Sequence, residues 1–143
     1  MESPAAPTFW RFSFLQGRGL AVPYAGTIRP RVEELSPGLA RVRLEDQRAV
    51  RNHLCSVHAC ALANLGETTA GMAMMSLQPP GERWIVTRMD VEFLKKARGT
   101  LTCECRLDPW PTEPGEFLGL AQIRNRDQEV VCAVTVHYKI GSR

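Results

Sequence analysis

The sequence of 143 residues contains one long segment that is almost free of charge. Among the 30 residues from 52 to 81, only Glu67 is formally charged, although charged residues make up 23% of the whole chain. On a helix, the apolar residues between 59 and 75 would lie on nearly all sides. A helix that is apolar on every side is buried on every side. The segment therefore predicts a central helix enclosed by the rest of the chain, with one carboxylate retained in it.

A membrane span is the first alternative for this segment, because a spanning helix needs about 20 apolar residues. The window from Leu54 to Leu77 contains polar side chains that include Ser56, His58, Asn64, Glu67, Thr68 and Thr69. That density favours a buried helix in a soluble protein. The N-terminus has no basic region followed by an apolar run, so no secretory signal is expected. We expect a cytoplasmic protein with no membrane contact.

Alternating apolar and polar residues predict about six strands around this helix. Two precede it and form a hairpin across a Ser-Pro-Gly turn, at 27–35 and 39–45, and four follow it, at 84–94, 100–107, 117–124 and 129–140. Within the strand at 84–94, we place Ile85, Met89, Val91 and Phe93 on one face.

The order of these elements predicts an α+β fold in which an antiparallel sheet curls around one long helix. A short N-terminal helix is expected at 8–16, after a loose tail at 1–8, and residues 20–26 read as irregular. No linker or repeat divides the chain, so residues 1–143 are expected to form one domain. The net charge of +3 permits an anionic ligand and does not indicate nucleic acid.

The five cysteines are interpreted as reduced, buried thiols, because their number is odd and no export signal precedes them. Cys55, His58 and Cys60 match no standard zinc spacing, and no second ligand pair completes a site. We therefore expect neither a metal nor a resident cofactor.

Glu67 is a candidate functional residue on physical grounds. Burying an unpaired carboxylate is costly, so Glu67 is hydrogen-bonded, protonated or turned toward a wet cleft. Desolvation raises the pKa of a carboxyl group and makes the carboxylate a better general base. The structural alternative is a Glu that is hydrogen-bonded to a polar neighbour such as Asn64.

The segment that leads into the helix carries Asn52, His53 and His58. The first turn of a helix presents free backbone N–H groups that can polarise a carbonyl oxygen. The structural alternative is that Asn52 or Ser56 caps the helix and that His58 is a satisfied polar residue at its entry.

His58 and Glu67 are nine residues apart, which on one helix is half a turn out of phase with a rise of ~13.5 Å. The two side chains cannot meet on one helix. If they share a site, Glu67 comes from a second copy of the chain, and the spacing then predicts a homodimer.

The pattern Asn52-x5-His58-Ala59-Cys60-x6-Glu67 resembles the motif of hotdog-fold acyl-CoA thioesterases of the phenylacetyl-CoA thioesterase-like branch. More narrowly, residues 58–67 are similar to an uncharacterised bacterial hotdog subfamily with Glu as the acid. Residues 91–99 resemble the same proteins' strand that ends in Lys-Pro-Ala-x-x-Gly. In place of the family's Gly-Gly the chain has Ala59-Cys60, which crowds the backbone.

The resemblance implies hydrolysis of an acyl-CoA thioester at a dimer interface, with further pairing to a tetramer possible. Glu67 would act as general base or nucleophile, the Ala59 N–H would polarise the thioester carbonyl, and Asn52 would orient water or substrate. His58 would support the loop or touch the thioester region. Coenzyme A, as part of the substrate, would place its phosphates near Lys95, Lys96 and Arg98.

Two alternatives share this fold. One is a non-catalytic module that binds acyl-CoA or a fatty acyl group, which the Ala59-Cys60 replacement keeps open. The other is a β-hydroxyacyl dehydratase, in which His53 and Glu67 would have the required spacing of fourteen residues. The Phe-Pro-Gly and Met-Pro-Gly elements of the dehydratases are absent from the sequence.

Overall fold

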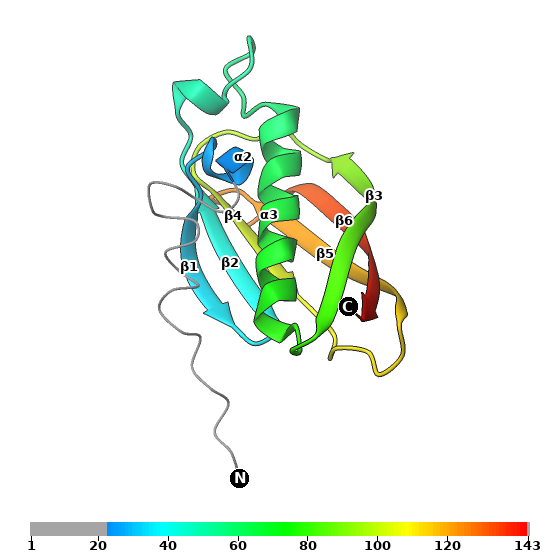
Figure 1. Ribbon diagram of the computed structural model, residues 1–143. Helices are drawn as coiled ribbons and strands as arrows, with labels where there is room; N and C mark the ends of the chain where they lie inside the picture. The colour runs from blue at the N-terminus through cyan, green and yellow to red at the C-terminus, as the bar shows by residue number, and fades with distance from the viewer. Residues whose placement is uncertain (1–22, 143) are drawn as a thin grey trace.

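The computed structural model describes residues 23–142, in which a six-stranded sheet packs against one long helix (Figure 1). The helices are α2 (Pro23–Gly26), the 3-10 helix η1 (Arg48–Val50) and α3 (Ala59–Leu77). The strands are β1 (Arg31–Ser36), β2 (Leu39–Leu44), β3 (Glu82–Phe93), β4 (Leu101–Arg106), β5 (Gly115–Arg124) and β6 (Val130–Ser142).

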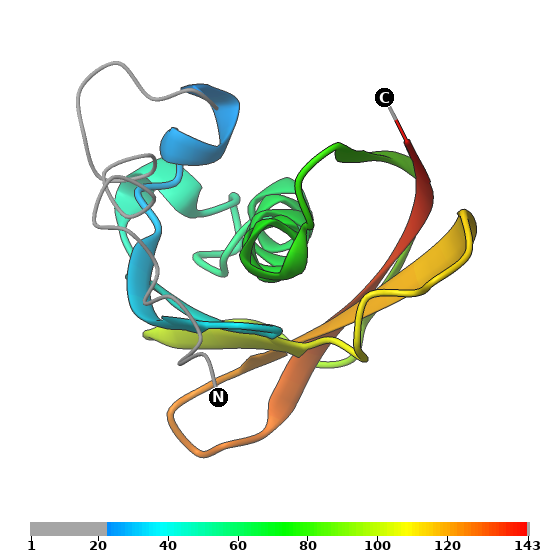
Figure 2. The same ribbon diagram turned by 60° about the horizontal axis from the view of Figure 1, so that its bottom comes forward.

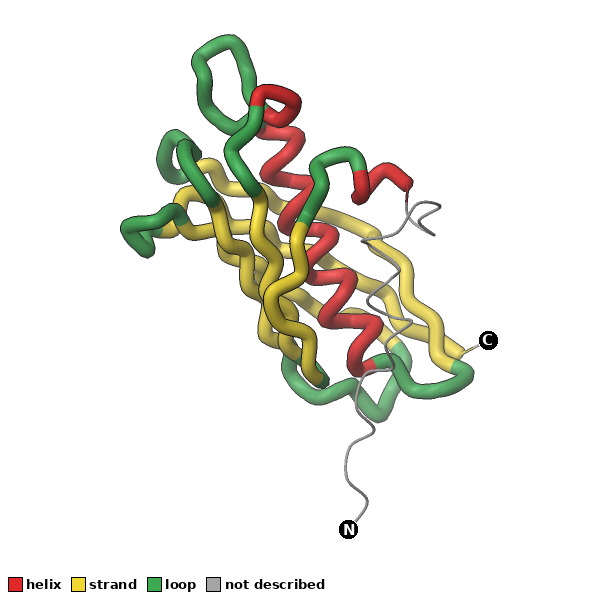
Figure 3. The backbone as a smooth tube through the Cα atoms, turned by 90° about the vertical axis from the view of Figure 1, so that its left-hand side faces the viewer, coloured by secondary structure: helices red, strands yellow, loops and turns green. Residues whose placement is uncertain are grey.

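The strand order is β1-β2-β4-β5-β6-β3, and every neighbouring pair is antiparallel. The sheet curls, and α3 lies within its concave side (Figure 2). Seen from the side, the helix runs along the length of the strands (Figure 3). The predicted α+β architecture, a curled antiparallel sheet around one central helix, is confirmed. Strands β1 and β3 form the two edges.

The core lies between α3 and the inner face of the sheet. Strand alternation supplies that face, because successive side chains of a strand point to opposite sides. Alternate residues of β4 and β6 are accordingly buried: Leu101, Cys103, Cys105, Cys132, Val134, Val136, Tyr138 and Ile140. Apart from the buried Val131, the residues between them on these strands have intermediate or high exposure.

Gly66 sets how closely α3 approaches the sheet. A Cβ atom at Gly66 would lie 2.3 Å from Cγ2 and 2.6 Å from Cβ of Val134 on β6. Real Cβ atoms do not tolerate such contacts, so only glycine allows the helix to rest on β6 at this position.

Two segments near the N-terminus differ from the sequence prediction. β1 begins at Arg31 rather than at residue 27, because Thr27 and Arg29 donate their N–H groups to the turn carbonyls of Tyr24 and Gly26. Residues 23–26 form helix α2 within the stretch predicted to be irregular. The predicted helix at 8–16 and the tail at 1–8 lie outside the described residues.

Ile85 is on the opposite face of β3 from the one predicted. A β-bulge between Val86 and Arg88 inserts Thr87 as an extra residue. Val86 therefore pairs with the inward Tyr138 and Met89 with the inward Val136, whereas Ile85 pairs with the outward Lys139. The prediction is wrong for Ile85 because a strict two-residue period cannot accommodate a bulge.

All five cysteines are free thiols, but only three are buried. Cys103, Cys105 and Cys132 are in the core, and the prediction that Cys55 and Cys60 are buried is wrong. Both lie at the entry to α3, which the described chain leaves uncovered. In the described part of the chain, no helix is long and apolar enough to cross a membrane.

The Gly66 contact predicts a large effect of a single methyl group. Gly66→Ala should destabilise the fold by about 1–3 kcal/mol, because the methyl group overpacks the interface with Val134. Gly71→Ala is the matched control on the same helix, since its Cβ would meet only ordinary contacts at 3.7 and 3.9 Å. Urea unfolding of both variants measures the difference, and equal stability of the two would contradict the close approach.

Candidate functional site

Glu67 lies in the middle of α3 and is partly buried. Desolvation by the surrounding apolar groups raises its pKa above the ordinary value for a glutamate. Within residues 23–142, no ion pair or hydrogen bond of the Glu67 carboxylate is found. The one charge in the apolar segment is therefore left uncompensated by the part of the chain that the structure describes.

The structural alternative for Glu67 was a hydrogen bond to Asn64, and the structure does not contain that bond. Asn64 instead accepts a hydrogen bond from the Thr68 hydroxyl at 2.9 Å and donates to the Tyr24 carbonyl at 3.4 Å. These contacts hold α2 against α3. Asn64 is thereby occupied with structural contacts, and Glu67 is not held by it.

Glu67 lies beside Gly71 and Trp84. A Cβ atom at Gly71 would lie 3.9 Å from Oε1 of Glu67 and 3.7 Å from Cη2 of Trp84, so the carboxylate and the indole are close neighbours. Trp84 contacts Tyr138 edge-on, with ring centroids 5.1 Å apart.

Tyr138 is fully buried, and its hydroxyl has no hydrogen-bond partner among the described residues. Burial raises the pKa of Tyr138, and the negative charge of Glu67 raises it further, which places the two groups within electrostatic reach. Sequence reasoning missed Gly71, Trp84 and Tyr138. The available signal was that Gly71 follows Glu67 by four residues and so shares its helix face.

The inner face of β3 is not covered by the described chain. Val86, Met89 and Phe93 pair with inward residues of β6, yet they are 38%, 36% and 54% exposed. Apolar side chains on the core side of a sheet are normally buried. The inner face of the edge strand β3 is thus left partly open to solvent by residues 23–142.

His58 is the N-cap of α3, since its Nδ1 accepts the N–H of Cys60 at 3.0 Å. Capping therefore falls to His58, and not to Asn52 or Ser56 as the structural alternative supposed. Ala59 begins the helix and is exposed. Its N–H has no partner among the described residues, as expected for the first turn of a helix.

Asn52 holds the loop that leads to this cap. Its Oδ1 accepts the N–H groups of Leu54 at 2.9 Å and Ser56 at 3.2 Å. The backbone of the same loop is closed by the Asn52 N–H bond to the Ser56 carbonyl at 2.8 Å. The Oδ1 atom of Asn52 thus stabilises the conformation of the loop. His53, at the tip of this loop, is exposed.

The basic loop after β3 lies against the entry to α3. The N–H of Val57 donates to the carbonyl of Ala97 at 2.8 Å, and Arg98 reaches the Leu54 carbonyl at 3.4 Å. Lys95 forms an ion pair with Glu129, whereas Lys96 is exposed and makes no ion pair among residues 23–142. The chain therefore brings the loop cations to the helix entry.

Glu67 is not part of this cluster within one chain. His58 lies at the N-cap and Glu67 two and a half turns along the helix, about 13 Å away along its axis. The structure thus assembles Asn52, His58, Ala59 and the basic loop at one end of α3, and leaves Glu67 alone beside Trp84.

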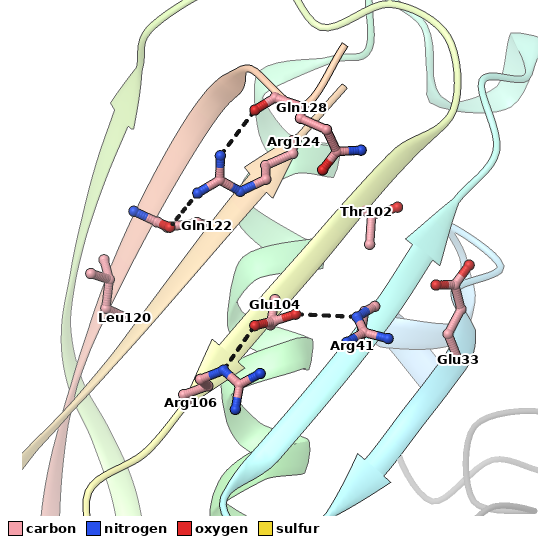
Figure 4. Close-up of a pocket in the computed structure, with 9 residues that line it drawn as sticks. All are labelled: Glu33, Arg41, Thr102, Glu104, Arg106, Leu120, Gln122, Arg124 and Gln128. Atoms are coloured by element: carbon pink, nitrogen blue, oxygen red, sulfur yellow. Dashed lines mark hydrogen bonds and ion pairs between the residues drawn. The ribbon is translucent and has the colours of Figure 1, made fainter. Parts of the chain in front are cut away.

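A separate hollow of about 570 Å³ lies on the outer face of the sheet (Figure 4). Its lining comes from β1, β2, β4, β5 and the turn after β5: Glu33, Arg41, Thr102, Glu104, Arg106, Leu120, Gln122, Arg124 and Gln128. Glu104 bridges Arg41 and Arg106, so charges in the hollow largely neutralise each other. The sheet separates this hollow from Glu67.

Solved structures with the same architecture identify the class of fold. The chain is 25% identical to PA5026 from Pseudomonas aeruginosa, a protein of unknown function described as a probable thioesterase, with a TM-score of 0.86 over 96% of this chain and 97% of that one. It is 32% identical to genomics target APC5556, with a TM-score of 0.79 over 85% and 82%. The thioesterase SAV0944 from Staphylococcus aureus shares the fold at 15% identity, with a TM-score of 0.74 over 83% and 98%.

The fold is therefore the hotdog fold found in these thioesterases, as the sequence motif implied. No curated protein matches the chain. The family described as a domain of unknown function, DUF4442, matches residues 10–141, and the chain belongs to that family.

The raised pKa of Glu67 predicts a pH-dependent gain in stability for Glu67→Gln. The folded state binds the Glu67 proton more tightly than the unfolded state does. The free energy of unfolding of wild type therefore decreases as the pH rises from the unfolded pKa through the folded pKa of Glu67. The variant should melt at a higher temperature than wild type at pH 8, and the difference should vanish at a pH below the unfolded pKa of about 4.3.

Glu92→Gln on exposed β3 is the control, for which we expect no such pattern. Thermal melts of the three proteins from pH 3.5 to pH 8 provide the measurement. A Glu67→Gln variant that is less stable than wild type at pH 8 would show that the carboxylate has a stabilising partner.

Proposed function

We propose that the protein hydrolyses the thioester bond of an acyl-CoA in the cytoplasm, at a site formed between two copies of the chain. The observation that supports this most strongly is the desolvated carboxylate of Glu67 on the central helix, which has no ion pair or hydrogen bond within residues 23–142. A lone carboxylate of this kind is a candidate general base. The hotdog fold, and the 25% identity to a protein described as a probable thioesterase, agree with this reaction class.

Glu67 would supply the attacking group. As general base it would take a proton from water while the water oxygen attacks the thioester carbon. The tetrahedral intermediate would then expel the coenzyme A thiolate, which takes the proton back to leave a carboxylic acid and free coenzyme A. Alternatively, the Glu67 carboxylate would attack the thioester carbon directly and expel the coenzyme A thiolate. Water would then hydrolyse the resulting anhydride, and this route requires the same position of Glu67 beside the thioester.

The second copy would complete the site with its helix entry. Within one chain the Ala59 N–H and Glu67 are too far apart along α3 to act on one carbonyl. A second copy laid against the uncovered inner face of β3 would bury Val86, Met89 and Phe93 and bring its Ala59 N–H toward Glu67. That N–H would stabilise the oxyanion of the intermediate, while His58 and Asn52 would hold the loop that presents it.

Coenzyme A phosphates would lie near the basic loop beside that helix entry. Lys96 and Arg98 are the cations best placed for this, because Lys95 is already paired with Glu129. The carbonyl oxygen of Asn52 is used by the loop, so any contact from Asn52 to water or substrate would come from its amide nitrogen.

Replacing Ala59 with proline tests the oxyanion role without removing the helix. Proline is favoured at the first helical position, and the backbone of His58, at φ −63° and ψ 142°, already suits a residue that precedes proline. Ala59→Pro should lower kcat by about 100- to 1000-fold through loss of one N–H, with an unchanged melting temperature. Unchanged turnover would contradict the role.

Thiol release from a panel of acyl-CoAs tests the reaction itself, with Glu67→Gln as the comparison. Hydrolysis by wild type that is lost in Glu67→Gln supports the proposal. Tight acyl-CoA binding with no turnover on any substrate would favour the non-catalytic binding module. Hydration of an enoyl-CoA that is lost in His53→Ala and retained in His58→Ala would favour the dehydratase.

A further inference from the structure

The hollow on the outer face of the sheet is neutralised at only one of its two ends (Figure 4). At that end, the Glu104 carboxylate accepts hydrogen bonds from the Nε atoms of Arg41 at 3.1 Å and Arg106 at 3.0 Å. Glu33, the other carboxylate of the lining, forms an ion pair with Arg43 at 3.7 Å. Both carboxylates of the hollow are therefore already paired with cations.

The other end is formed by Arg124, whose charge is not neutralised by a carboxylate within residues 23–142. Its Nη1 donates to the backbone carbonyl of Gln128 at 2.9 Å, and its Nη2 donates to Oε1 of Gln122 at 3.2 Å. Both acceptors are neutral, so they hold the guanidinium in place without cancelling its charge. A guanidinium has five N–H donors, so three of them remain for another partner.

Two further donors lie beside Arg124. Thr102 on β4 is directly opposite Arg124 in the ladder, so both side chains stand on the outer face. The Thr102 hydroxyl makes no hydrogen bond in the described part of the chain. The Gln122 amide accepts from Arg124 through its oxygen, which leaves its Nε2 free to donate. Free donors thus surround one uncompensated positive charge.

An oxyanion is the ligand that such a set of donors recognises. Three donor groups on two strands match the three terminal oxygens of a phosphate monoester better than the two oxygens of a carboxylate. The volume of about 570 Å³ is that of a site for a small organic ligand. Leu120 also lines the hollow and is 48% exposed, which supplies an apolar contact for the organic part.

We propose that the outer face of the sheet binds a small phosphate monoester. The phosphoryl group lies on Arg124, Thr102 and Gln122, and the organic part of the ligand lies against Leu120. This site goes beyond the proposed hydrolase, because the sheet separates the hollow from Glu67.

Titration of the full-length protein with phenyl phosphate tests the site, with inorganic phosphate, benzoate and phenol as comparisons. Binding is followed by amide NMR at constant ionic strength. We expect phenyl phosphate to bind most tightly and to shift the backbone amides of Thr102, Gln122 and Arg124. Benzoate that binds as tightly as phenyl phosphate would overturn the phosphate assignment, and shifts confined to residues 95–98, or no binding at all, would overturn the site.

Two substitutions in the hollow should change the affinity for phenyl phosphate in opposite directions. Arg124→Gln should weaken binding by about tenfold or more, because charge-assisted hydrogen bonds are lost. Glu104→Gln should tighten binding a few-fold, because it removes a like charge from the same hollow. Arg48→Gln is the matched control, since Arg48 is exposed on η1 outside the hollow and should leave the affinity unchanged. Weaker binding in both hollow variants would indicate local structural damage and would contradict the charge argument.

Three further outcomes would overturn the proposal. Undiminished binding in Arg124→Gln would exclude the guanidinium as the phosphate ligand. Binding that is lost in Lys96→Gln would assign the phosphoryl group to the basic loop. A changed oligomeric state of Arg124→Gln by light scattering, with no phosphate binding by wild type, would show that a second copy of the chain occupies this face. Acyl-CoA hydrolysis is a separate readout, so this proposal and the hydrolase can fail independently.

Discussion

The contact between Gly66 and Val134 determines how the central helix sits on its sheet. Since a Cβ atom at Gly66 would lie 2.3 Å from Val134, the helix can approach β6 only through a bare backbone. This approach fixes the rotation of α3, and the neighbouring Glu67 is turned away from the centre of the sheet, toward Trp84 at the start of β3. The position of the one retained charge thus follows from a packing constraint one residue away.

The inner face of β3 presents apolar side chains that residues 23–142 do not cover. The edge strand β3 presents Val86, Met89 and Phe93 on the core side, yet α3 leaves them partly exposed. The other half of the proposed site, the capped entry of α3 with its basic loop, lies at the far end of the helix from Glu67. A second copy related by two-fold symmetry would cover the surface and join these halves twice. The burial of the apolar face of β3 and the completion of the proposed site therefore favour the same two-fold dimer.

Much of this could be predicted from the sequence, because it depends on local periodicity. The alternation in β4 and β6 identified the inward residues, and the lack of charge around Glu67 identified both the helix and its candidate base. The bulge at Thr87 was not predictable, because the sequence does not show where one extra residue interrupts the alternation of a strand. Ile85 was therefore placed on the wrong face of β3. The proximity of Trp84 to Glu67 could not be predicted either, since Gly71 on α3 and Trp84 on β3 come together only through tertiary packing.

Mixing two inactive variants tests most directly the central claim that the site is shared between two chains. Glu67→Gln lacks the base and Ala59→Pro lacks the carbonyl-polarising N–H, so each homodimer should be inactive toward an acyl-CoA that wild type hydrolyses. After denaturation together and refolding, heterodimers should regain hydrolysis, because one of their two sites combines an intact Glu67 with an intact Ala59 N–H from the other chain. Activity that stays at the level of the separate variants, with heterodimers shown to be present by mass spectrometry, would contradict a shared site.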